Sequence, residues 1–391
     1  MSEHPPYRIP YGRQQIDASD IAAVVEVLQG DWLTQGPAIE AFEQAFARYV
    51  DSTYAVAVSS GTAALHLSVL ALGVAPGQQV ITTPLTFAAT ANCVRYAGGQ
   101  VALCDIDPAT GLLDLDAVER RLAAASPGTY AGIIPVDYAG LGADMEAFRK
   151  LADRHGLWLL EDSCHAPGGS FTASDGQPQR CGSGAWADLA IFSFHPVKHI
   201  ACGEGGMITT RDAALAARLR MLRNHGITRD PDLLHQQPGG WYYEMQLLGF
   251  NYRLTDIQAA LGLSQLMRAD ANLARRRALA QRYDTAFAAM PVRPLPAVPG
   301  HAYHLYVVRV DDRKGLYDHL RARGVFAQVH YIPVHLHPAY EALGFCRGDL
   351  PHAEAFYDQC LSLPLYPDLS DEQQAYVIAT VGEFVGLVDN T

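Results

Sequence analysis

Short apolar runs rich in β-branched residues alternate with helical patterns over residues 54–210. After the first run, Leu65, Val69 and Leu72 recur at the spacing of one helix face, and Gly73 follows where a glycine commonly ends a helix. Strands that alternate with helices predict an α/β fold whose sheet is mainly parallel. The predicted strands are YAVAVS, QVITT, VALCDID, AGIIPVDYAG, LWLLED, DLAIFSF and MITT.

Further helices are expected on either side of this region. Asp20 is placed to cap a helix that runs through Gln29, and Asp212 opens another in the segment DAALAARLRMLRNHG. A long pattern rich in Ala, Leu and Arg predicts helical structure from Thr255 to Met290. The Pro-rich stretch PVRPLPAVPG that follows cannot continue a helix and is expected to lead into a second unit.

The second unit has its own pattern of strands and helices. HAYHLYVVRV and VFAQVHY look like strands, whereas RKGLYDHLRARG and the last residues look like helices. We therefore predict an N-terminal segment and large α/β domain over residues 1–291 and a smaller α+β domain over residues 292–391. A chain of 391 residues is long enough for two such units with a sizeable core.

Composition and charge exclude several classes of protein. Hydrophobic residues make up 49% and charged residues 18% of the chain, as in ordinary globular proteins. The formal net charge of −12 makes nucleic acids and anionic membranes poor partners. The seven cysteines are odd in number and lack zinc-ligand spacing, which indicates a reduced, cytoplasmic protein. The segment MSEHPPYRIPYGR lacks the apolar core of a signal peptide, and no stretch reaches the length of a membrane span.

One glycine motif has to be set aside. The segment GSGAWA at 182–187 matches the pattern of dinucleotide-binding loops. Such a loop must follow a strand and open a helix, whereas this segment precedes the predicted strand DLAIFSF. We interpret it as a chance match, which leaves a nicotinamide oxidoreductase without support.

Three segments carry candidate chemistry, and the first is the small polar turn Ser59–Thr62 between a predicted strand and a predicted helix. Its backbone N–H groups and hydroxyls could bind a phosphate at the positive end of the helix dipole. A simple helix cap by Ser60 or Thr62 is an equally good interpretation. The turn alone therefore leaves both readings open.

The second segment, LWLLEDSCHA, places Glu161, Asp162 and His165 just beyond an apolar strand, where open α/β sheets bind ligands. A carboxylate there could anchor a cationic ring nitrogen, and a solvated loop acid is the alternative. The third, FSFHPVKHIACGEGGMITT, carries Lys198 between a strand end and a glycine cluster. A lysine with a lowered pKa could form a Schiff base with an aldehyde there, although most single lysines are surface residues. A phosphate turn, a carboxylate and a lysine on successive strand ends are what a pyridoxal 5′-phosphate (PLP) enzyme needs.

The histidines near the C-terminus suggest a metal site. His330, His335 and His337 lie close together in the sequence, with His301 and His304 upstream. Prolines interrupt this segment, so no helical pair of ligands forms and zinc would lack a fixed third ligand. We expect no metal, a substrate contact for His330, and surface positions for most of the others.

Taken together, the motifs resemble in order and spacing those of the DegT/DnrJ/StrS group of nucleotide-sugar aminotransferases. The resemblance rests on SSGTAALHL, TPLTFAATAN, EDSCHA, FSFHPVKHIACGEGGMITT and LGFNYRLTDIQAALG, and it covers nearly the whole chain. It implies the fold-type I PLP-dependent transferase architecture. DWLTQG, TANC, VDYAG, SFHPVK and AQVHY are further similar to the pseudaminic acid pathway branch, which implies amination of a UDP-4-keto-6-deoxy-N-acetylhexosamine at C4 with L-glutamate as donor.

The resemblance implies roles for individual residues at the cofactor. Lys198 would form the Schiff base and act as general acid and base, and Asp162 would keep the pyridine nitrogen protonated. His165 stands where many members carry Gln beside the phenolic oxygen of the cofactor. The other implied cofactor contacts are Phe87 stacked on the ring, Gly61, Thr62 and Ser193 in the phosphate and cofactor cradle, and Asn251, which would reach the phosphate from the neighbouring subunit.

The same resemblance implies the partners. Tyr11, Thr34, His330 and Tyr331 match positions that line the sugar-nucleotide pocket, so a nucleotide-linked ketosugar and L-glutamate are the expected substrates. The implied role of Asn251 requires a homodimer with shared active sites. The aromatic stretch GGWYYEMQLLGFNYR has the composition of a buried interface, although a core segment within one chain is an alternative.

Other functions remain to be weighed. Some relatives of this fold are dehydratases that have lost the Schiff-base lysine, and a non-catalytic regulatory homologue would be expected to lose Lys198 or Asp162. Both residues are present here. An aminotransferase acting on another UDP- or dTDP-linked 3-keto or 4-keto sugar stays open, because pocket shape rather than motif decides the substrate.

Overall fold

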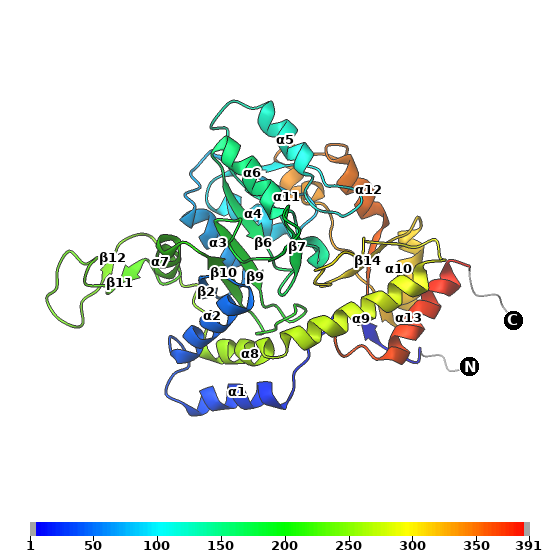
Figure 1. Cartoon of the computed structure of the whole chain (residues 1–391), viewed down its shortest axis with the longest axis horizontal. Coiled ribbons are helices and arrows are strands. Elements are labelled where there is room, and N and C mark those ends of the chain that lie inside the picture. Colours follow the sequence, from blue (N-terminus) through cyan, green and yellow to red (C-terminus); the bar gives the residue numbers. More distant parts are fainter. Residues whose placement is uncertain (1–4, 387–391) are drawn as a thin grey trace.

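The computed structural model describes residues 5–386. A seven-stranded sheet, in the order β2-β10-β9-β6-β5-β3-β4, lies at the centre of its larger part (Figure 1). All neighbouring strands are parallel except β10, which is antiparallel to both β2 and β9. The prediction of a mainly parallel α/β sheet is therefore confirmed. The strands are β2 (Tyr54–Val58), β3 (Gln79–Thr82), β4 (Gln100–Leu103), β5 (Tyr130–Ile134), β6 (Trp158–Asp162), β9 (Leu189–Ser193) and β10 (Gly206–Thr210).

Helices cover both faces of the sheet, as a parallel sheet requires. Val56 and Val58 of β2 pack into a buried cluster with α3, whereas Ala55 and Ala57 pack on the other face with α2 and α8. α3 is buried on almost every side, because it lies against the sheet and contacts α4 and α7. The helices of this part are α1 (Ala18–Gln29), α2 (Pro37–Tyr49), α3 (Gly61–Ala71), α4 (Ala88–Tyr96), α5 (Leu115–Ala123), η1 (Tyr138–Gly140), α6 (Met145–His155), α7 (Ala213–Leu222) and α8 (Asp256–Leu266).

The predicted cap of α1 is wrong. Asp17 is the N-cap, and its carboxylate accepts the backbone N–H groups of Ser19 and Asp20. Asp20 is the third helical residue, where its carboxylate accepts the N–H of Asp17 (3.0 Å) and pairs with Arg268 (2.7 Å). Because Arg268 lies 248 residues further on, nothing in the sequence near α1 reveals this pairing.

Residues 255–290 are helical as predicted, and they form two helices. α8 begins after Thr255, whose hydroxyl caps it, and α9 (Ala269–Phe287) follows after a break. Arg268 stands in the break with φ −106° and ψ 1°, outside helical geometry. Arg268 also pairs with Asp17 (2.9 Å). This ion pair connects the start of α1 to the segment between α8 and α9.

The long helix α9 leads into the smaller part of the molecule (Figure 1). Its sheet has the order β13-β14-β16, and its core includes the apolar faces of α9, α10 and α13. The N-terminal strand β1 pairs in parallel with β15, which belongs to this smaller part. The domain boundary after residue 291 stays a prediction. The elements are β1 (Ile9–Pro10), β13 (Arg293–Pro294), β14 (Tyr306–Arg309), α10 (Arg313–Ala322), β15 (Val325–Phe326), η2 (Val334–Leu336), α11 (Pro338–Glu341), α12 (Pro351–Gln359), β16 (Cys360–Leu363) and α13 (Asp371–Phe384).

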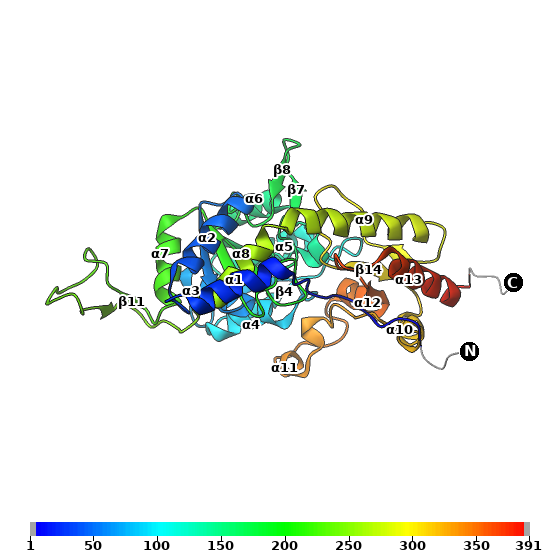
Figure 2. The same cartoon turned by 90° about the horizontal axis from the view of Figure 1, so that it is seen from below.

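A hairpin of β11 (Ile227–Thr228) and β12 (Glu244–Met245) projects from the body of the molecule beyond α7 (Figures 1 and 2). Trp241 and Leu248 of the aromatic stretch are 73% and 79% exposed in the single chain. The alternative of a core segment is therefore wrong for this part of the stretch. Phe250 and Tyr252 at its end pack partly against the cluster around α3.

The segment GSGAWA lies in the loop between β8 (Pro178–Arg180), which pairs with β7 (Ser170–Thr172), and β9. It does follow a strand, β8, but it leads into β9 and opens no helix, so its interpretation as a chance match is confirmed by the missing helix. Among residues 5–386, no helix combines the length and the apolar character that crossing a bilayer requires.

Candidate active site

The carboxyl ends of the parallel strands border a cavity of about 640 Å³. Ligands of open α/β sheets bind at this edge. The turn after β2, the start of α4, the ends of β6 and β9, and the loop after β15 all contribute to its walls. Ten of the twelve predicted site residues line it, namely Tyr11, Gly61, Thr62, Phe87, Asp162, His165, Ser193, Lys198, His330 and Tyr331.

α3 presents its N-terminus to this cavity. Ser60 is the N-cap, and its hydroxyl accepts the N–H of Ala63 (3.0 Å), so the capping interpretation is confirmed. Gly61 and Thr62 follow as the first helical residues, whose N–H groups have no partner within the helix. A Cβ on Gly61 would lie 2.8 Å from the Cβ of Ser193, so only glycine allows the turn to pack this closely against the end of β9. The turn thus offers N–H donors and the positive end of a helix dipole to an anion in the cavity.

Asp162 ends β6 and is buried, so the alternative of a solvated loop acid is wrong. Its Oδ2 accepts the hydroxyl of Thr90 (2.7 Å), and its Oδ1 accepts the backbone N–H of Cys164 (3.2 Å). The Thr90 oxygen lies 2.9 Å from that of Thr86, which donates to it when Thr90 donates to Asp162. These bonds fix the orientation of the carboxylate at the cavity wall. The sequence does not reveal Thr90, because α4 and β6 meet only in the folded chain.

Lys198 follows β9 and faces the cavity. Its pKa lies below the ordinary lysine range because burial disfavours the ammonium form, an effect that Cys164 and Asp162 partly oppose. Its Nζ lies 3.4 Å from Nε2 of His304, a residue that the sequence did not single out for this site. A lowered pKa increases the share of neutral amine, the form that attacks a carbonyl and accepts a proton.

His165 is buried beside Lys198 with a neutral ring. Burial first, and then the charge of Lys198, lowers its pKa well below the ordinary histidine range. Its Nδ1 accepts the backbone N–H of Ala139 (3.2 Å), so the ring proton resides on Nε2. Nε2 lies 3.0 Å from the hydroxyl oxygen of Tyr331. His165 is therefore a hydrogen-bond donor on the side of Tyr331.

Aromatic side chains form another wall of the cavity. Phe87 is 62% exposed in the single chain, and its ring centroid lies 6.3 Å from that of Tyr331. Tyr11 and His330 have ring centroids 5.0 Å apart, and Nδ1 of His330 lies 2.8 Å from Oγ of Ser362. An exposed apolar ring beside several polar groups suits a ligand with a flat ring and polar substituents.

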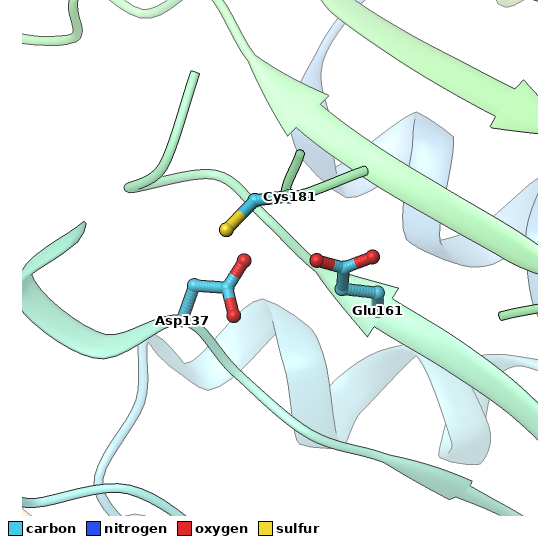
Figure 3. A group of neighbouring side chains, drawn as sticks. All are labelled: Asp137, Glu161 and Cys181. Carbon is cyan, nitrogen blue, oxygen red and sulfur yellow. The ribbon is translucent and has the colours of Figure 1, made fainter. Parts of the chain in front are cut away.

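The carboxyl groups of Asp137 and Glu161 meet in the core beside the thiol of Cys181 (Figure 3). Ser163 Oγ lies 3.0 Å from Glu161 Oε1 and also bonds to Asp137, and the N–H of Gly182 donates to Glu161 Oε1 (2.9 Å). Burial raises the pKa of Asp137 to about 6, and burial together with the Asp137 charge raises the pKa of Glu161 well above its ordinary range. The pair therefore retains a proton at neutral pH, and Glu161 faces this cluster rather than the cavity.

The other two predicted site residues lie away from the cavity. Thr34 and Asn251 are exposed, and neither lines it. Thr34 is bridged to Thr255 and Asn251 to Asn224, and the residues next to them, among them Gln35 and Asn224, line a second cavity of about 410 Å³. Within one chain the structure thus does not bring these two residues to Lys198.

The expectation that most C-terminal histidines lie at the surface is wrong. His301, His304 and His335 are at most 5% exposed. His335 Nε2 lies 2.9 Å from a carboxylate oxygen of Glu354, and His301 Nδ1 accepts the N–H of Tyr303 (2.9 Å). Prolines in a segment argue against a helix, but they carry no information about its burial.

The residues of the main cavity fit PLP. This cofactor needs an anion site for its phosphate, a carboxylate for its ring nitrogen and a lysine for its aldehyde. The N-terminus of α3, where Gly61 and Thr62 line the cavity with N–H groups that have no partner in the helix, meets the first requirement. Asp162 and Lys198 meet the other two from the ends of neighbouring parallel strands.

Comparisons with known proteins support this fit. The family model described as the DegT/DnrJ/EryC1/StrS aminotransferase family matches residues 14–382. The chain is 40% identical over 388 residues to the spore coat polysaccharide biosynthesis protein SpsC of Bacillus subtilis (strain 168), over 96% of this chain and 97% of SpsC. Its fold is similar to that of Helicobacter pylori PseC, an aminotransferase involved in the biosynthesis of pseudoaminic acid (TM-score 0.88, 31% identity, 98% and 100% coverage). It is similar as well to Spr1654 of Streptococcus pneumoniae in the PLP form (TM-score 0.88, 30% identity, 98% and 100% coverage).

Proposed function

We infer the reaction from the fact that the chain belongs to the DegT/DnrJ/EryC1/StrS aminotransferase family, whose members are PLP-dependent sugar aminotransferases of fold type I. The proposed reaction transfers the amino group of L-glutamate to C4 of a UDP-4-keto-6-deoxy-N-acetylhexosamine. This is the reaction type of pseudaminic acid biosynthesis. The observation that carries the substrate is the similarity to PseC over the whole length of both chains. The arrangement of Tyr11, His330 and Tyr331 around the cavity supports it, because polar and aromatic groups there can contact a sugar.

The proposed roles follow from where each side chain lies. Bound PLP supplies an electron sink for the carbon that loses a proton. Asp162, oriented by Thr90, is proposed to keep the ring nitrogen protonated by its negative charge. Lys198, whose lowered pKa favours the neutral amine, is proposed to take the proton from the donor and return it to the product. Gly61 and Thr62 would hold the phosphate at the start of α3.

The remaining cofactor and substrate contacts are proposed for the other lining residues. His165 carries its proton on Nε2 and can donate to an oxygen of the cofactor ring, as an amide at this position would. Phe87 offers an exposed apolar face for stacking on that ring. Ser193 lies beside Gly61 and completes the cradle.

We propose a homodimer with shared active sites to account for Thr34 and Asn251. Both lie in one exposed region of the chain, away from the main cavity. The projecting hairpin beyond α7, with Trp241 73% exposed, would bury its apolar side chains against the partner subunit. In such a dimer, Asn251 of one chain would reach the phosphate held by the other.

A second substrate class has its own support. SpsC, at 40% identity, is a spore coat polysaccharide biosynthesis protein, so another UDP- or dTDP-linked 3-keto or 4-keto sugar is the alternative acceptor. Both candidates use the same cofactor chemistry and differ only in the acceptor sugar.

One experiment tests the cofactor chemistry and the substrate. Purified protein loaded with PLP is first reduced with borohydride, which should attach the cofactor to Lys198 in a peptide identified by mass spectrometry. Unreduced enzyme is then incubated with L-glutamate and each of a panel of UDP- and dTDP-linked 3-keto and 4-keto sugars. We expect an amino sugar from the UDP-4-keto-6-deoxy-N-acetylhexosamine. A product from a dTDP-linked or 3-keto sugar instead would establish the alternative, and cofactor attached to another lysine would remove Lys198 from the reaction.

A further inference from the structure

Lys198 lies among three buried imidazoles. His165, His199 and His304 are each at most 7% exposed, and the ring centroid of His304 lies 4.3 Å from that of His165 and 5.8 Å from that of His199. His304 is the one of the three that hydrogen-bonds to the amine, with Nε2 3.4 Å from Nζ. Within residues 5–386, this is the one side-chain hydrogen bond that Lys198 makes.

The hydrogen bonds of the three rings assign their protons. His165 accepts a backbone N–H at Nδ1, and His199 faces the carbonyl of Ala302 with Nε2 (2.8 Å), so both neutral rings carry their proton on Nε2. When Lys198 is protonated it has only donors, so His304 then offers the lone pair of Nε2 and carries its proton on Nδ1, which has no hydrogen-bond partner within residues 5–386. His304 is thus the imidazole whose acceptor nitrogen is aimed at the lysine.

The neighbouring charges keep His304 neutral. Burial first, then the charge of Lys198, the rings of His165 and His199 and the guanidinium of Arg276, lowers its pKa well below the ordinary histidine range. A neutral ring does not repel the ammonium of Lys198, whereas a second cation would. His304 can therefore stabilise the protonated lysine as a fixed acceptor.

The backbone around His304 is held from several sides. Ala302 donates its N–H to the carbonyl of Gly140 (2.7 Å), and Leu305 donates its N–H to the carbonyl of Ala139 (3.2 Å). The buried guanidinium of Arg276 donates to the carbonyl of His304 itself (3.4 Å). Such a support gives the ring little freedom to leave Lys198.

We propose that His304 is a positioning residue for Lys198, accepting a hydrogen bond from its amine and so holding the proton-carrying nitrogen over the cavity. This rests on the proposed role of Lys198. The lysine must be free of the cofactor whenever it moves a proton, and its ammonium form then needs a hydrogen-bond acceptor. His304 supplies that acceptor without adding a charge.

The test measures the lysine directly. Cofactor-free full-length protein is acetylated with limiting acetic anhydride from pH 6 to 11, and the labelling of Lys198 is followed by peptide mass spectrometry. In His304→Leu the ammonium loses its acceptor, so the apparent pKa of Lys198 should fall by about one unit or more. His304→Gln, which keeps an acceptor at similar reach, should restore the wild-type profile. His199→Gln, which keeps the donor to Ala302, serves as the matched control and should leave the profile unchanged.

The PLP-loaded variants supply a second readout. We expect His304→Leu to lower kcat roughly tenfold with little change in either KM, and His304→Gln to recover most of it. An unchanged labelling profile in folded His304→Leu would overturn the proposal, as would a His304→Gln variant that is as impaired as His304→Leu. Failure of the proposed function would show separately, because borohydride would then not attach the cofactor to Lys198 while the labelling profile could still be read.

Discussion

Because Asp137 and Glu161 share a proton in the folded protein, we can predict how the free energy of unfolding depends on pH. The contacts favour Glu161 as the carrier of that proton, because its Oε1 accepts the N–H of Gly182, Ser163 donates its one hydroxyl proton to Asp137, and Glu161 in turn donates to Asp137. Glu161→Gln keeps this shape, with an amide N–H in place of the carboxyl O–H. The substitution therefore removes a titration from the folded protein while it preserves the hydrogen bonds.

The direction and size of the change in the free energy of unfolding follow from the coupling of proton binding to folding. The folded-state pKa of Glu161 is raised well above its ordinary value of 4.5, so between pH 4.5 and the folded-state pKa the folded protein binds one proton more than the unfolded chain. The free energy of unfolding then falls by about 1.36 kcal/mol for each pH unit over that window. Glutamine does not titrate, so in Glu161→Gln the free energy of unfolding does not fall with pH for this reason. For every pH unit over which the folded protein keeps this proton, the variant should gain about 1.36 kcal/mol relative to the wild type.

Urea unfolding of the cofactor-free proteins at pH 6, 7 and 8, at one protein concentration, measures this difference. Removing the cofactor eliminates the pH dependence of its binding from the comparison. Glu341→Gln serves as the control, because it makes the same chemical change at an exposed position. If the wild type and Glu161→Gln keep a constant difference across the three pH values, Glu161 is ionised in the folded protein and the shared-proton interpretation is refuted.

Four other outcomes are expected. Lys198→Ala should abolish transamination yet still bind PLP non-covalently, and more than trace turnover without added amine would exclude Lys198 from the chemistry. Asp162→Asn should keep its circular dichroism spectrum but lose most activity, because an amide does not stabilise a pyridinium; near wild-type turnover would contradict this. Gly61→Ala should weaken PLP binding about tenfold in equilibrium dialysis, whereas Gly240→Ala, where a Cβ meets nothing within 4 Å, should not; equal affinities would remove Gly61 from the cradle. Co-expressed, differently tagged Lys198→Ala and Asn251→Ala chains should form a hybrid dimer with about half the wild-type activity, and a hybrid as inactive as its parents would mean that each site is built from one chain.

Features set by a few adjacent residues could be predicted from the sequence. Gly73 adopts φ +80° directly after α3, and the side chain of Asp212 caps α7, because both conformations depend on local backbone chemistry. The order of Asp162 and Lys198 on neighbouring strand ends was also predictable, since parallel strands share one carboxyl edge.

Features set by contacts between distant segments could not be predicted. Asp20 pairs with Arg268 rather than capping α1, and Thr90 reaches Asp162 from another element. His304 comes to Lys198 from 106 residues further along the chain, in a segment whose histidines looked exposed. In each case the local pattern is compatible with several environments, and tertiary packing selects one of them.

The pairing of β1 has a consequence for folding during synthesis on the ribosome. The backbone partners of Ile9 and Tyr11 are Gly324, Val325 and Leu365, so the first of them is made about 315 residues after Ile9 (324 − 9 = 315). At roughly 5–20 residues per second, the N-terminal strand waits on the order of 15–60 s for its neighbour to be synthesised. Tyr11 takes its place at the cavity only after that docking. The sheet of the larger part can form much earlier, but this wall of the pocket is completed only when translation is nearly finished.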